Sequence, residues 1–66
     1  MAESDRAAEL SRLQHDLRTP LTIVVGFAEL LGTDRTLPDA DRREYAQRIL
    51  GAAGEIRELI DGARLD

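Results

Sequence analysis

The residues of this chain best suited to chemistry lie together in the run His15-Asp16-Leu17-Arg18-Thr19-Pro20-Leu21. His15 is the only histidine, and imidazole offers an unprotonated ring nitrogen as a nucleophile near neutral pH. Asp16 follows directly and can accept a proton from one ring nitrogen, which leaves the lone pair of the other free to attack. Thr19 lies one helical turn after His15, so its hydroxyl shares the same face. This arrangement favours nucleophilic chemistry at His15.

A helix is predicted to position these groups. Apolar residues recur at spacings of three and four through the segment, at Leu10, Leu13, Leu17 and Leu21. At 3.6 residues per turn, His15 projects about 160° away from Leu17, in the middle of this stripe. The sequence therefore predicts a histidine on the solvent side of an amphipathic helix, where a partner can reach it, and not a core residue.

Pro20 interrupts the regular backbone of this helix. Proline lacks the N–H that would bond to the carbonyl four residues earlier, and its ring opposes that carbonyl, so we expect a bend around Asp16. An interior proline costs a helix about 3 kcal/mol or more. Such strain is easier to understand where a site requires it.

The chain as a whole is predicted to be all-α, with one domain over residues 1–66. A helix is expected at about 4–31, a loop at about 32–39 and a second helix at about 40–64. Leu10, Leu17, Val24 and Leu31 repeat every seven residues, which indicates a helix-packing seam, and Gly32 is well placed just after the helix end. The second helix has its own apolar register, at Ala46, Ile49, Ala53, Ile56, Ile60 and Ala63.

Two helices joined by a short loop form an antiparallel hairpin. The first helix has more apolar surface than one partner can cover, because Ile23, Phe27 and Leu30 form a second strip roughly 100° from the main seam. A chain of 66 residues rarely folds alone without disulfides, metal or self-association, and this one has no cysteine. We therefore expect two hairpins to pair into a homodimeric four-helix bundle.

Composition excludes several classes of function. The net charge is −4, from nine basic and thirteen acidic residues, which argues against nucleic acid or an anionic membrane as the main partner. One Tyr and one Phe provide no stacking platform for bases. With no cysteine and a single histidine, no metal site is expected. No segment is long and apolar enough for us to expect a membrane-spanning helix, and the first residues show no signal-peptide pattern.

Gly51, Gly54 and Gly62 lie inside the second predicted helix, where each costs roughly 1 kcal/mol relative to alanine. They can be tolerated surface positions. Alternatively, they mark close helix approach or the docking of a partner.

The motif and its helical setting resemble the H-box of two-component sensor histidine kinases: His, an acidic residue, two variable positions, Thr or Asn, then Pro. The resemblance covers nearly the whole chain and implies a dimerisation and histidine-phosphotransfer domain. It implies that His15 is the phosphoacceptor and Asp16 the general base. It further implies that Thr19 positions a water in the reverse, phosphatase reaction, and that the bend at Pro20 allows switching between activities.

The resemblance also implies partners. ATP and Mg²⁺ would be bound by a separate catalytic domain, so this chain is expected to bind no cofactor and to be inactive alone. A response-regulator receiver domain is expected to dock below the histidine on the first helix, together with the second helix. The location would be cytoplasmic, with the parent kinase in some cases anchored in the inner or plasma membrane. The residues expected at the docking surface are Thr22, Ile23, Gly26, Phe27 and Leu30.

Two other interpretations remain open at this point. One is a stand-alone phosphotransfer relay protein that has no catalytic domain. The other is a purely structural homodimerisation bundle whose histidine takes part in no reaction.

Overall fold

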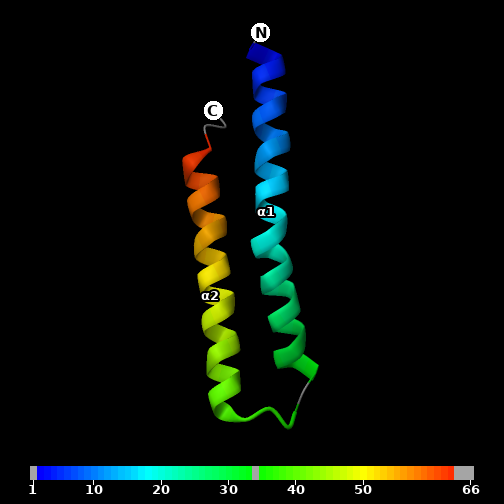
Figure 1. Cartoon of the computed structure of the whole chain (residues 1–66), viewed down its shortest axis with the longest axis vertical. Helices are drawn as coiled ribbons and strands as arrows, with labels where there is room; N and C mark the ends of the chain where they lie inside the picture. The colour runs from blue at the N-terminus through cyan, green and yellow to red at the C-terminus, as the bar shows by residue number, and fades with distance from the viewer. Residues whose placement is uncertain (1, 34, 64–66) are drawn as a thin grey trace.

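The computed structural model describes residues 2–33 and 35–63, and it contains two helices that form a hairpin (Figure 1). Helix α1 spans Ala2–Thr33 and helix α2 spans Asp39–Gly62. The helices run antiparallel, so the start of α1 and the end of α2 lie at the same end of a rod of about 55 × 17 × 13 Å (Figure 1). No strand occurs among the described residues, and the predicted all-α hairpin is confirmed.

The helix ends differ from those predicted. Helix α1 continues through Gly32 to Thr33, and no glycine in the described ranges has a positive φ, so the prediction that Gly32 follows the helix end was wrong. Helix α2 ends at Gly62 because Ala63 turns to an extended conformation, with φ −83° and ψ 134°. The end predicted at about residue 64 lies outside the described residues.

The start of α2 follows from its local sequence. Pro38 is extended, with φ −61° and ψ 152°, and its carbonyl accepts a hydrogen bond from the Arg42 amide at 2.9 Å. Asp39 and Asp41 then fall in the first turn, where their negative charge is favourable near the positive end of the helix dipole.

The two helices meet along one seam of buried and half-buried side chains. Ala52 is 5% exposed, and Pro20 is the other buried residue of the part that the structure describes. The rings of Phe27 and Tyr45 meet across the seam with centroids 5.0 Å apart and planes inclined at 46°. The half-buried apolar residues of the seam are Leu13, Leu17, Val24, Phe27 and Leu31 on α1, Tyr45, Ile49, Ile56 and Leu59 on α2, and Ala63 just after the end of α2.

The rotation of α1 about its axis differs in part from the prediction. Leu17, Val24 and Leu31 lie on the seam, as expected, but Leu10 is 46% exposed and Leu21 is 53% exposed. On α2, Ala46, Ala53 and Ile60 are likewise exposed, although the sequence pattern assigned them to the packing stripe. The seam therefore uses one edge of each predicted stripe and leaves the other edge uncovered.

Two further observations bear on partners. Within the described residues, neither helix contains a stretch that is long and apolar enough to cross a membrane. Over the same residues, no three side chains of histidine, cysteine, aspartate or glutamate gather where they could hold a metal ion.

Candidate phosphoacceptor site

His15 lies on the exposed side of α1. Leu13 and Leu17, two positions before and after it, are half-buried in the seam. Two positions on a helix correspond to about 160° of rotation, so the imidazole must point away from α2. Among the described residues, no hydrogen bond or ion pair involves its side chain. Both ring nitrogens are therefore accessible to a reacting partner.

Asp16 and Thr19 are also exposed, and they adjoin His15 in different directions. Thr19 is one turn further along the same face, whereas Asp16 lies about 100° around the helix, toward α2. Neither side chain has a hydrogen bond or ion pair within the described ranges. Both polar groups are thus available to the imidazole or to a molecule that approaches it.

Pro20 is buried on the seam, and α1 remains an α-helix on both sides of it. Because proline has no N–H, the carbonyl of Asp16 lacks its usual helical partner. The bend expected here remains a prediction. Sequence reasoning treated Pro20 only as a helix breaker and missed its packing role, which its spacing from Leu17 and Val24 could have indicated.

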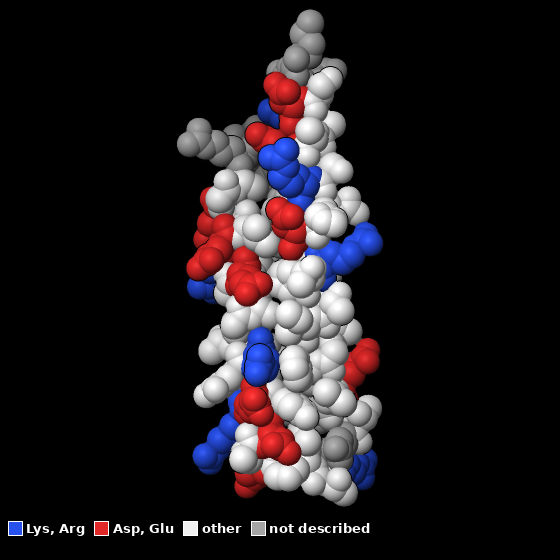
Figure 2. All heavy atoms as spheres, viewed as in Figure 1, with Lys and Arg blue, Asp and Glu red and all other residues white. Residues whose placement is uncertain are grey.

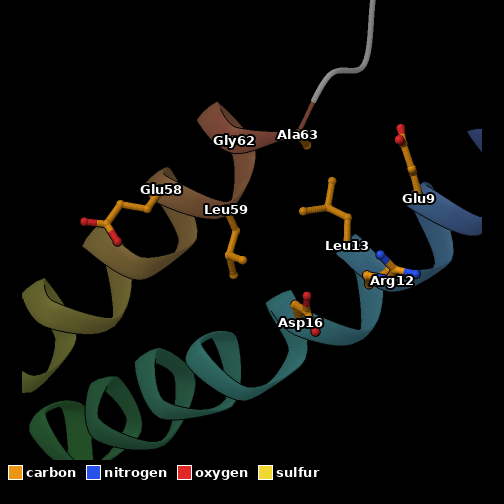
Figure 3. A pocket seen from close by; sticks show the side chains of 8 residues that line it. All are labelled: Glu9, Arg12, Leu13, Asp16, Glu58, Leu59, Gly62 and Ala63. Atoms are coloured by element: carbon orange, nitrogen blue, oxygen red, sulfur yellow. The ribbon is translucent and has the colours of Figure 1, made fainter.

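An upper groove lies between α1 and the end of α2, beside the histidine turn (Figure 3). Leu13 and Leu59 point into this groove from opposite helices, while the carboxylate of Glu58 points away from α1. Asp16 contributes to the wall, so the carboxylate next to His15 borders a partly apolar hollow. The upper groove is lined by Glu9, Arg12, Leu13, Asp16, Glu58, Leu59, Gly62 and Ala63.

A lower groove lies further along the hairpin. Ile23 and Phe27 line it from α1. These two belong to the five residues that were predicted to dock a partner. Thr22, Gly26 and Leu30 are exposed but do not line it. The α2 side of the lower groove consists of Gln47, Arg48, Gly51, Ala52 and Glu55, of which the sequence pattern singled out only Gly51 as a possible docking position.

Local interactions around the lower groove are modest. The Thr22 hydroxyl donates a hydrogen bond to the Arg18 carbonyl at 2.8 Å. Arg48 and Glu44 form an ion pair at 3.6 Å one turn apart on α2, with both side chains more than half exposed. Figure 2 shows charged side chains of both signs along the junction of the helices, and a mostly uncharged area over the lower half of α1.

Comparisons with known proteins identify a family whose model matches nearly the whole chain. The family described as the His Kinase A (phospho-acceptor) domain matches residues 5–65. The sensor histidine kinase YcbM of Bacillus subtilis is 31% identical over 52 residues, which are 79% of this chain and 17% of that protein. The histidine protein kinase DivJ of Caulobacter vibrioides is 37% identical over 57 residues, 85% of this chain and 10% of that protein.

The sensor protein KdpD of Escherichia coli is 37% identical over 67 aligned positions, which cover 96% of this chain and 8% of that protein. The chain thus spans only 17% of the length of YcbM, 10% of DivJ and 8% of KdpD. No solved structure matches it significantly. Because the family match extends over almost the whole chain and includes the exposed histidine, this chain belongs to the His Kinase A (phospho-acceptor) domain family.

Proposed function

We propose that this chain is the phosphoacceptor and dimerisation module of a two-component sensor histidine kinase. His15 accepts the γ-phosphoryl group of ATP, which a separate catalytic domain presents, and passes it to an aspartate of a response regulator. The exposure of His15 on the side of α1 opposite the seam carries this proposal. We expect the module to work on the cytoplasmic side of the membrane, where ATP and receiver domains are found.

In the first step, a nitrogen of the His15 ring attacks the γ-phosphorus of ATP. A P–N bond forms while the P–O bond to ADP breaks, and Asp16 accepts the proton from the other ring nitrogen. Mg²⁺ held with ATP in the catalytic domain neutralises charge on the phosphates. The position of Asp16, next to His15 and at the wall of the upper groove, supports its role as the base.

In the second step, a carboxylate oxygen of the regulator's aspartate attacks the phosphorus. The P–N bond breaks, and Asp16 returns the proton to the ring. Thr19, on the same face as His15, is placed to orient a water molecule when the regulator is dephosphorylated. The receiver domain docks at the lower groove and on the exposed residues beside it, where the predicted docking residues lie: Thr22, Ile23, Gly26, Phe27 and Leu30.

The proposed dimer uses the opposite flank of the hairpin. Leu21 lies about 160° around α1 from Ile23, which lines the lower groove. Ile60 lies about 180° around α2 from Gly51, which lines the same groove. Leu21 and Ile60 therefore both face away from the lower groove. Leu21 is 53% exposed and Ile60 is 48% exposed. Pairing two hairpins along this flank would bury both and complete a four-helix bundle.

The test is phosphorylation with radiolabelled ATP and the catalytic domain of the kinase encoded together with this chain. The wild-type chain should acquire an acid-labile, alkali-stable label, which is typical of a phosphorylated histidine. His15→Gln should remove the label completely, while the matched exposed variant Gln14→Ala should retain it. Label that persists in His15→Gln, or a wild-type chain that stays unlabelled beside an active catalytic domain, would refute the proposal.

A further inference from the structure

Gly51 lies in the interior of α2, where glycine is the least favourable residue after proline. A Cβ atom added at Gly51 would meet nothing within 4 Å, and the same holds for Gly54. Close approach of α1 therefore explains neither glycine. The space beside each glycine is open, so a molecule outside the hairpin can approach the backbone there.

The two glycines differ in their surroundings. Gly51 lines the lower groove together with Ile23 and Phe27, whereas Gly54 lines neither groove. The groove combines this bare stretch of α2 backbone with apolar side chains from α1, so a partner can pack directly against the main chain. The groove lining carries one residue of each charge: Arg48, which pairs with Glu44, and Glu55, which has no ion pair within the described ranges and can therefore pair with a basic side chain of a partner.

The lower groove is also at a suitable distance from the reacting histidine. Ile23 follows His15 by eight residues, which corresponds to about 12 Å along the helix axis. A domain of about 100 residues has a radius of gyration of about 13 Å, so a receiver domain seated in the groove can also reach His15.

We propose that Gly51 is a specificity-determining position, whose missing side chain lets the receiver domain approach the backbone of α2. This inference rests on the proposed function, because it assumes that a receiver domain takes the phosphoryl group from His15. A second copy of this chain is the competing occupant. The exposed apolar residues Leu21 and Ile60 favour dimerisation on the opposite flank, so the lower groove is left for the receiver domain.

The experiment uses the 66-residue chain phosphorylated at His15 with potassium phosphoramidate, a small donor that replaces the catalytic domain. Receiver domains purified from the organism that encodes the chain are screened, and the one that takes the phosphoryl group fastest is retained. The second-order rate of transfer is then measured for the wild type, Gly51→Ala, Gly51→Leu and the matched control Gly54→Leu. Thermal midpoints and molar masses are recorded for each variant.

Gly51→Leu should lower the transfer rate at least about tenfold, since overpacking a fitted contact is strongly unfavourable. Gly51→Ala should lower transfer less, while raising the thermal midpoint by about 4–8 °C because alanine favours the helix. A purely structural role would not change stability and transfer in opposite directions. Gly54→Leu should transfer at the wild-type rate.

Three results would overturn the inference. The first is a wild-type rate of phosphoryl transfer in Gly51→Leu, and the second is an equal loss of transfer rate in Gly54→Leu. The third is dissociation of the dimer in Gly51→Leu, which would assign the lower groove to a second copy of the chain. Failure of the wild-type phosphorylated chain to transfer to any receiver domain is a different outcome. That outcome would refute the proposed function itself.

Discussion

Replacing Leu21 by glutamate should weaken the proposed dimer without unfolding the hairpin. Leu21 is 53% exposed on the flank opposite the lower groove. Full burial of a leucine is worth about 1.5–3 kcal/mol, so covering the exposed half is worth about 1 kcal/mol. A two-fold dimer buries the residue twice, and the loss is therefore about 2 kcal/mol, or about 30-fold in the dissociation constant. The cost of desolvating two carboxylates adds to this value.

The control for this variant is Leu30→Glu. Leu30 is 44% exposed and lies nine positions from Leu21, on the opposite side of α1 at about 180°. The same chemical change there should leave the dimer intact. Sedimentation equilibrium over a range of protein concentrations gives the dissociation constants, and circular dichroism gives helix content. Equal weakening by both variants, or weakening by Leu30→Glu alone, would refute the assignment of the two flanks.

Three further predictions concern individual contacts. Asp16→Asn should slow phosphorylation by the catalytic domain at least about 100-fold in a labelling assay, with stability within about 0.5 kcal/mol of the wild type; an unchanged rate would exclude its role as base. A double-mutant cycle with Phe27→Leu and Tyr45→Leu should give a coupling free energy of about 0.5–1.5 kcal/mol in thermal unfolding, and zero coupling would contradict the ring contact. Arg48→Gln should change the free energy of unfolding by less than about 0.5 kcal/mol, because its ion pair with Glu44 is exposed; a larger loss would indicate a contact beyond this pair.

The sequence was sufficient to predict the helical hairpin and the exposure of His15, because both depend on local periodicity. It was not sufficient to predict the rotation of the helices. On α1, Leu10 and Leu21 have the same three-and-four spacing as Leu13 and Leu17, and periodicity does not say which edge of a wide apolar surface faces α2. The structure shows that the edge with Leu13 and Leu17 does.

Pro20 illustrates a second limit. Its missing N–H made it a predicted helix breaker, although its ring is also an apolar side chain at a seam position. Most of the α2 side of the lower groove could not be predicted for a related reason, although Gly51 was a candidate docking position. Arg48, Gly51 and Glu55 have polar or absent side chains, so only the rotation of α2 against α1 brings them to the groove.

The burial of Pro20 links the reactive turn mechanically to the opposite helix. The ring of Pro20 is buried in the seam. Because proline has no N–H, the carbonyl of Asp16, next to His15, accepts no hydrogen bond from the amide four residues later. A displacement of α2 along α1 can therefore shift the turn that carries His15 without breaking a backbone hydrogen bond at the Asp16 carbonyl. Movement of α2 relative to α1 would therefore reach the histidine turn through Pro20 as well as through the seam residues Leu13 and Leu17.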